Sequence, residues 1–225
     1  MKTYQMITGV VLSFIGTSCE LSKSPLSDVP VSEPDVIRVI AEADRDISSS
    51  NTSSSLLRVT LYDKHEEFIE LKKGSVAVNG LPMSYLMLGE YERNDVVQPD
   101  YDYTFTVTLS DGSNYSCHVH TPKNLYQMTV PSTYDRKSAL TITWGDADPQ
   151  AQGTLSFYGD TTSASVNVTS GQGSVTVQPS SLVGLHSGQT LRVELEYKRK
   201  GTVDVGFMST SIAGAWFTIT RSMKI

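Results

Sequence analysis

The sequence predicts an all-β protein made of two antiparallel β-sandwiches in series, and three observations lead to this prediction. From residue 36 onward, apolar and polar residues alternate with a period of two, and almost no stretch has apolar residues at helical spacing. Turn dipeptides such as Asn79-Gly80, Asp111-Gly112 and Lys200-Gly201 separate the alternating runs. The chain of 225 residues is long enough for two domains of about 100 residues each.

The first 18 residues have the organisation of a secretory signal peptide. A lysine at position 2 precedes an apolar run over residues 6–15, and three small residues follow before Cys19. This run is too short to cross a bilayer. The ending Thr17-Ser18-Cys19-Glu20 resembles the lipobox of bacterial lipoproteins, with Gly16 where leucine is usual. The resemblance implies that Cys19 is acylated, with palmitate among its chains, and becomes the mature N-terminus; a plain secreted protein is the alternative.

Residues 19–35 are expected to form a flexible tether. The segment is polar, and Pro25, Pro30 and Pro34 are spaced along it. Proline spacing of this kind favours extended, polyproline-like conformations, so the segment would hold a folded domain away from a membrane surface. A disordered terminus is the alternative, and it predicts the same flexibility.

Residues 36–122 are predicted to form the first sandwich and residues 123–225 the second, with the boundary next to Pro122. The strand candidates in each half have one apolar and one polar face, as half-exposed antiparallel sheets require; they include 57–61, 105–109, 140–144, 166–168 and 191–197. Trp144 alternates with Leu140 and Ile142, which predicts that its ring lies in the core of the second sandwich. The facing of Trp216 stays open, because both of its neighbours are apolar.

Three stretches resemble known β-sandwich proteins. The segment Ser138–Trp144 resembles the strand that places the core tryptophan of immunoglobulin-like and fibronectin-type domains. Gly74–Pro82 and Gly173–Gly206 are similar to stretches of two-domain, lipid-anchored β-sandwich proteins of Gram-negative envelopes. The resemblance implies two immunoglobulin-like sandwiches and an envelope location, and it carries no enzymatic activity over to this chain.

Charge excludes some partners. The formal net charge is −6, which argues against a protein that binds nucleic acid by neutralising phosphates. Residues 36–122 carry 13 acidic and seven basic residues, whereas residues 123–225 carry seven acidic and nine basic ones. A polybasic surface that docks on a membrane is therefore not expected.

An acidic, tyrosine-rich segment is the candidate binding loop. Clustered carboxylates suit Ca²⁺, and tyrosines on a loop suit a protein or carbohydrate contact. A solvated loop between two strands is the alternative. The candidate residues are Glu90, Tyr91, Glu92, Asp95, Asp100, Tyr101 and Asp102.

His118 and His120 are weak candidates for a metal site. Their spacing places both imidazoles on one face of a strand, about 7 Å apart. A metal site would need a third ligand from another strand, and the sequence has no HExxH or paired CxxC motif that supplies one. Cys117 lies on the opposite face from His118, so it is read as a small buried hydrophobic residue instead of a nucleophile.

The sequence thus favours a lipid-anchored envelope protein, in the outer membrane of a Gram-negative bacterium, that acts as a non-catalytic binding or structural module. Its expected partners are the membrane, through the anchor, and an unidentified protein or glycan that contacts loops at the end of a sandwich. No cofactor is expected. The alternative is a metal-dependent enzyme that uses His118 and His120; a third ligand near both imidazoles would discriminate the two hypotheses.

Overall fold

The structure, a computed structural model, describes residues 33–48, 53–123, 128–145, 148–160, 163–169 and 171–225. The predicted signal peptide, Cys19 and the tether up to residue 32 lie outside the described residues. No helix in the described part is long and apolar enough to cross a membrane.

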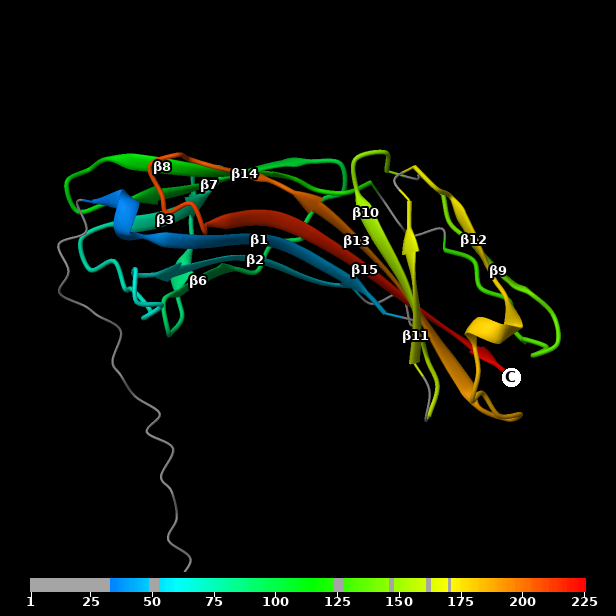
Figure 1. Cartoon of the computed structure of the whole chain (residues 1–225). Helices are drawn as coiled ribbons and strands as arrows, with labels where there is room; N and C mark the ends of the chain where they lie inside the picture. The colour runs from blue at the N-terminus through cyan, green and yellow to red at the C-terminus, as the bar shows by residue number, and fades with distance from the viewer. Residues whose placement is uncertain (1–32, 49–52, 124–127, 146–147, 161–162, 170) are drawn as a thin grey trace, which may run out of the picture.

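The described chain is almost entirely β-structure (Figure 1), which confirms the all-β prediction. Two short 3₁₀ turns, η1 (Pro34–Val36) and η2 (Pro179–Ser181), are its only helical elements in the described ranges. The strands are β1 (Arg38–Ile47), β2 (Ser53–Tyr62), β3 (Ser75–Val78), β4 (Leu81–Pro82), β5 (Ser84–Tyr85), β6 (Glu90–Arg93), β7 (Asp102–Thr108), β8 (Asn114–His120), β9 (Leu140–Thr143), β10 (Gln152–Tyr158), β11 (Ser163–Val168), β12 (Ser174–Val177), β13 (Thr190–Lys200), β14 (Thr202–Val203) and β15 (Ile212–Lys224).

One large sheet forms the backbone of the molecule. Its eight strands follow the order β11-β10-β13-β15-β1-β2-β6-β5. A five-stranded sheet, β14-β8-β7-β3-β4, covers the half that contains β1 and β2, and the two-stranded sheet β12-β9 covers the half that contains β10 and β11. The molecule therefore has two sandwiched regions that share a sheet.

Strand β15 links the two regions. Its residues 212–219 pair in parallel with residues 40–47 of β1, and its residues 214–224 pair with β13 in the antiparallel sense. The turn after β13 also places β14 beside β8 of the first half. The expected boundary at residue 122 separates β8 from β9 along the chain, but β13 to β15 return to complete the first sandwich. The β1–β15 pair is also parallel, unlike the expected antiparallel sheets.

The period-two pattern places the core as expected. Leu57, Val59 and Leu61 are buried on β2, and the apolar positions of β7, β9 and β13 are buried as well. Trp144 is 5% exposed, and its Nε1 donates a hydrogen bond to the hydroxyl of Tyr197 at 2.6 Å. This confirms the core position predicted for Trp144.

Candidate functional site

The acidic, tyrosine-rich segment is not one loop. Residues 90–93 form β6, which pairs with β2, and Asp102 begins β7. Tyr91 points into the core with 5% of its surface exposed, and its hydroxyl accepts the backbone N–H of Leu71 at 2.7 Å. Burial raises the pKa of Tyr91 to about 12. The prediction that Tyr91 presents its ring to a partner is therefore wrong, because the alternation Glu-Tyr-Glu-Arg turns it inward.

The remaining members of this segment are largely engaged with one another. Asp95 forms an ion pair with Arg93. Tyr101 is 47% exposed, and its ring lies 5.0 Å from that of buried Tyr103, centroid to centroid. Glu90 and Glu92 lie on β6 at half-buried positions. The exposed members of the predicted loop are Tyr101, its neighbours Asp100 and Asp102, and Asp95, whose side chain is 45% exposed.

His120 binds two carboxylates of the predicted loop. Its Nδ1 lies 2.7 Å from Oδ1 of Asp102, and its Nε2 lies 3.0 Å from Oδ1 of Asp100. Partial burial acts to lower the pKa of His120, but these two hydrogen bonds outweigh burial and raise it. The same contact lowers the pKa of Asp100. Because the imidazolium can satisfy both acids, the group is complete without an external ion.

His118 does not join this group. Its Nδ1 lies 3.0 Å from the Thr104 hydroxyl, so the carboxylates converge on one imidazole and not on both. In the described part of the chain, no cluster of three or more His, Cys, Asp or Glu residues could hold a metal ion. Cys117 is fully buried as predicted, and burial raises the pKa of its thiol to about 12.

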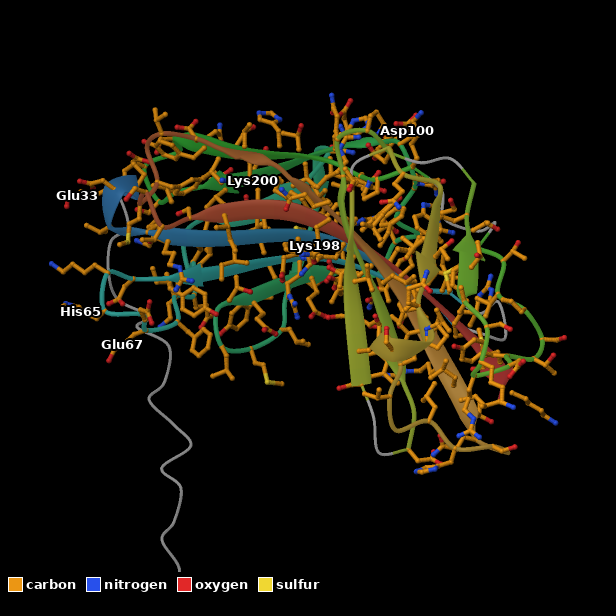
Figure 2. The ribbon with its side chains drawn as sticks, turned by 45° about the vertical axis from the view of Figure 1, so that its right-hand side comes forward. Glu33, His65, Glu67, Asp100, Lys198 and Lys200 are labelled. Atoms are coloured by element: carbon orange, nitrogen blue, oxygen red, sulfur yellow. The ribbon has the colours of Figure 1, made fainter. Side chains whose placement is uncertain are left out.

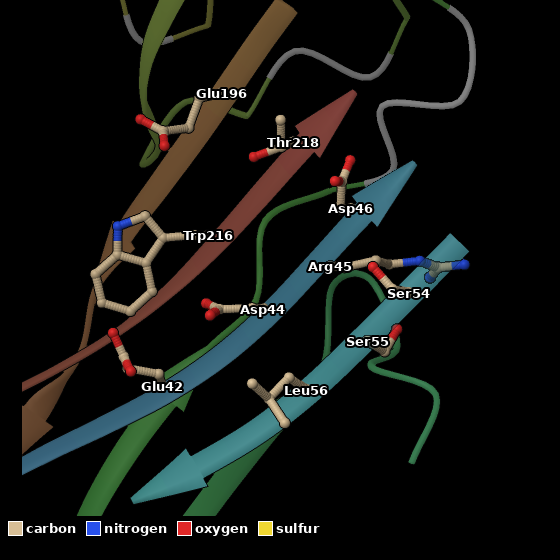
Figure 3. A pocket seen from close by; sticks show the side chains of 10 residues that line it. All are labelled: Glu42, Asp44, Arg45, Asp46, Ser54, Ser55, Leu56, Glu196, Trp216 and Thr218. Atoms are coloured by element: carbon tan, nitrogen blue, oxygen red, sulfur yellow. The ribbon is translucent and has the colours of Figure 1, made fainter. Parts of the chain in front are cut away.

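A second acidic group lies on the large sheet, on the face that carries Glu42, Asp44 and Asp46; we call this the outer face. A hollow of about 570 Å³ lies there at the middle of the sheet (Figure 3). We call it the sheet-face hollow. The lining residues that matter here are Glu42, Asp44, Leu56, Glu196, Trp216 and Thr218.

Strand register brings these side chains together. Asp44 on β1 is aligned with Trp216 on β15 and with Leu56 on β2. Along β1, Val39, Ala41 and Ala43 are buried, so the alternating acids must face outward. Asp44 therefore sits between two apolar side chains, in the centre of an otherwise polar sheet face.

Trp216 forms the aromatic wall of the hollow. Its neighbours Ala215 and Phe217 are buried, which directs the indole to the outer face. A Cβ added to Gly214 would lie 2.9 Å from Cη2 and 3.3 Å from Cζ3 of Trp216. The ring therefore leans over the glycine, and a larger residue at position 214 would displace it. Figure 3 shows the indole beside the carboxylates of Glu42 and Asp44.

The carboxylates of the hollow differ in their partners. Oε2 of Glu42 accepts two hydrogen bonds from Arg58, at 2.7 Å and 2.8 Å. Glu196 forms an ion pair with Lys198 at 2.9 Å, and Lys198, labelled in Figure 2, belongs to β13. In contrast, Oδ1 of Asp44 is buried and has no hydrogen-bond partner among the described residues.

The environment of Asp44 disfavours its charge. Burial, followed by repulsion from Glu42, raises the pKa of Asp44 to about 7. The charge of Arg58 acts to lower this pKa, and that of Glu196 acts to raise it further. An unsatisfied carboxylate oxygen in a hollow, with its pKa shifted by burial and by like charges, is typical of a ligand site.

Comparisons with known proteins give no family for this chain. No family model matches it, and no curated protein does. Similar solved structures include a cytokine receptor complex (9% identity, TM-score 0.38, covering 84% of this chain and 95% of that chain). The chicken CNTN1 FN1–FN3 domains follow (11%, 0.30, 85% and 69%), as do the fibronectin(III)-like modules of Clostridium thermocellum CbhA (12%, 0.28, 82% and 93%). These scores are too low to carry a functional conclusion.

Sequence reasoning missed the hollow. The signal was present in β1, where Glu42, Asp44 and Asp46 alternate with apolar residues. The alternation of Ala213, Ala215, Phe217 and Ile219 also determines the facing of Trp216, which the sequence left open. What the pattern could not reveal is the β1–β15 pairing, which brings residues more than 170 positions apart into one row.

Proposed function

We propose that the protein is a lipid-anchored protein of the bacterial cell envelope and acts as a non-catalytic binding module, with the sheet-face hollow as its contact surface. The observation that carries this proposal is that one hollow is lined by both the Trp216 ring and the half-buried Asp44. Aromatic rings with a few polar groups that point to the same space are common features of binding sites.

The hollow is a better contact surface than the predicted loop. Asp95, Asp100 and Asp102 of the loop already have partners within the molecule, Arg93 for Asp95 and the His120 imidazole for the other two. A partner that bound there would compete with Arg93 and His120 for these carboxylates. Asp44 lines the hollow without a hydrogen bond to its buried Oδ1, and a partner would use that oxygen once the carboxylate turned it toward the hollow.

Binding rather than catalysis is proposed because the described lining of the hollow contains no histidine, cysteine or lysine. The metal-dependent alternative has little support, because His118 and His120 contact different residues. Acidic net charge agrees with a partner other than nucleic acid.

The anchor has its own test. The Cys19→Ser substitution removes the residue that the lipobox would acylate, so the protein should leave the membrane fraction, since stable anchoring needs more than one acyl chain. Fractionation and mass spectrometry of the mature N-terminus measure this. A variant that still sediments with membranes, or a mature protein that starts at another residue, contradicts the lipoprotein assignment.

Site-specific crosslinking in intact cells tests the contact surface. A photoreactive amino acid at Thr218, which lines the hollow, should give a discrete adduct. The control position is Thr141 on β9, an exposed residue of the small sheet. No adduct from Thr218, or equal adducts from both positions, contradicts the proposed contact surface. If the protein converted a bound glycan into products, the non-catalytic assignment would be contradicted.

A further inference from the structure

We propose that the sheet-face hollow binds an organic cation: the guanidinium or ammonium group of an Arg or Lys side chain in a basic segment of a partner protein. This inference rests on the proposed function, because it names the ligand chemistry of the same surface. The charge balance of the hollow, the Trp216 ring and the unsatisfied Asp44 oxygen support it.

The hollow has more negative than positive groups. Glu42, Asp44, Asp46 and Glu196 line it. Among the described residues that line the hollow, Arg45 is the one cationic residue, and it donates a hydrogen bond from Nη1 to the backbone oxygen of Val97 at 2.9 Å. Arg45 is 8% exposed, because its position on β1 is an inward-facing one. Arg58 and Lys198 pair with Glu42 and Glu196 beside the hollow, so the carboxylates that an incoming cation would meet in excess are those of Asp44 and Asp46.

Trp216 and Asp44 are placed to contact one cationic group together. They are register partners on adjacent strands, so a group that lies over the indole is within reach of the carboxylate. Cations bind the faces of tryptophan rings favourably, and a guanidinium also forms strong hydrogen bonds with carboxylates. The Trp216 ring lies directly over Gly214, at a distance that leaves no room for a Cβ at that position.

Oδ1 of Asp44 lacks a donor and is covered by the protein, so a ligand N–H would reach it after the carboxylate turned toward the hollow that Asp44 lines. Hydroxyl groups of a neutral glycan could also donate to this oxygen. A neutral donor, however, leaves the repulsion between Asp44, Glu42 and Glu196 in place, whereas a cation reduces it. The electrostatics therefore favour a charged nitrogen over a sugar hydroxyl.

A metal ion fits the hollow poorly. Glu42, Asp44 and Asp46 occupy alternate positions on one strand, so neighbouring side chains start about 7 Å apart. Ca²⁺ requires oxygen ligands at 2.3–2.6 Å from a single point. Carboxylates spread along a row suit a long basic segment better than a small ion. At about 570 Å³, the hollow also has room for more than one side chain.

Binding should be coupled to the proton of Asp44. The charged groups that face Asp44 are Glu42 and Asp46 on β1, Arg58 on β2, and Glu196 and Lys198 on β13; β15 presents only Trp216 and Thr218. A cation binds the ionised carboxylate, and the raised pKa of Asp44 means that part of the population is protonated near pH 7. Affinity should therefore rise by about tenfold from pH 6 to pH 8.

Isothermal titration calorimetry with the full chain in detergent tests the inference. The probes are a tetra-arginine peptide, a tetraglycine peptide and neutral chito-oligosaccharide. We expect tetra-arginine alone to bind, about tenfold more tightly at pH 8 than at pH 6. Asp44→Asn and Trp216→Ala should each weaken it at least about tenfold, and Asp44→Asn should remove the pH dependence.

Asp160→Asn is the matched control, since it removes an equal charge from an exposed position away from the hollow. If Asp160→Asn lowered the affinity for tetra-arginine as much as Asp44→Asn does, the peptide would be responding only to net charge. That result would contradict binding in the sheet-face hollow. Melting temperatures identify any variant that fails to fold; Trp216→Phe then replaces Trp216→Ala and should weaken binding less. The protein could bind the oligosaccharide, or none of the probes, while Thr218 still forms its crosslink in cells. That result would contradict the inference that the hollow binds a cation, but it would not contradict the proposed function. Loss of the Thr218 crosslink overturns the proposed function itself.

Discussion

Two acidic groups in this molecule contrast in how their charges are balanced. At the edge of the first sandwich, Asp100 and Asp102 hold His120 between them, and the pKa of Asp100 is lowered. On the outer face of the large sheet, Asp44 lies beside Trp216 without a donor for Oδ1, and its pKa is raised to about 7. The first group is satisfied within the chain, whereas the second keeps a buried carboxylate oxygen without a hydrogen bond.

The contrast shows why a cluster of acids in the sequence is a poor guide to a binding site. In the richest acidic segment, around residues 90–102, Asp95, Asp100 and Asp102 are already paired with Arg93 or His120 of the same chain. The informative carboxylate is the one that the fold desolvates and leaves unpaired. Four predictions test or sharpen this difference, from the largest expected effect to the smallest.

The Asp44→Asn substitution should stabilise the protein at pH 8. A pKa raised from 3.8 to about 7 corresponds to about 4 kcal/mol if taken in full, and partial access to water reduces the expected gain to roughly 1 to 3 kcal/mol. Because the unfolded chain ionises Asp44 at lower pH than the folded one, wild-type stability falls as pH rises from about 4 through 7. Urea unfolding at pH 4.5 and pH 8 measures this; an equal effect at both values would contradict the raised pKa.

An arginine introduced beside Asp44 should give the second acidic group a basic partner within the chain, as the first group already has. Leu56 is the cross-strand neighbour of Asp44, so Leu56→Arg supplies a guanidinium beside the carboxylate. The pKa of Asp44 should fall, with a gain of about 0.5 to 1 kcal/mol at pH 8 relative to Leu56→Gln, which loses the same apolar contact without adding charge. Carboxyl chemical shifts followed by NMR report the titration. An unchanged pKa in Leu56→Arg would show that burial, and not missing charge, sets the value alone.

Removing His120, which contacts both carboxylates of the first group, should destabilise the protein, whereas Asp44→Asn should stabilise it. His120→Gln should destabilise the protein by less than about 1 kcal/mol, because the imidazole is partly exposed. The raised pKa of His120 stabilises the folded protein at pH values below the pKa that His120 has in the unfolded chain, and this stabilisation is lost as pH rises through the pKa in the folded protein. The lowered pKa of Asp100 stabilises the folded protein at pH values above the pKa that Asp100 has in the unfolded chain. The loss should therefore be largest near pH 5 and smaller at pH 8. His118→Gln, which touches Thr104 instead, is the control.

Local pattern predicted the strands of this molecule well, because alternation is a property of adjacent residues. It identified Trp144 and Cys117 as buried. It failed for Tyr91, where turn-forming residues after Arg93 concealed a short strand. It also could not pair β15 with β1, since a period of two specifies which face is apolar but not which strand lies beside it. The hollow depends on that pairing, so it could not be derived from the sequence.

The smallest effect is expected at the exposed tyrosine of the first group. Tyr101 is 47% exposed, and its backbone N–H donates to the Thr121 hydroxyl, a hydrogen bond that alanine retains. Tyr101→Ala should therefore change the free energy of unfolding by no more than about 0.5 kcal/mol. It should also leave the crosslink from Thr218 intact, because the proposed contact surface is the sheet-face hollow. If Tyr101→Ala abolished that crosslink while Asp44→Asn left it unchanged, the loop would be the contact surface after all. The unpaired oxygen of Asp44 would then be a cost that the fold tolerates without using it for binding.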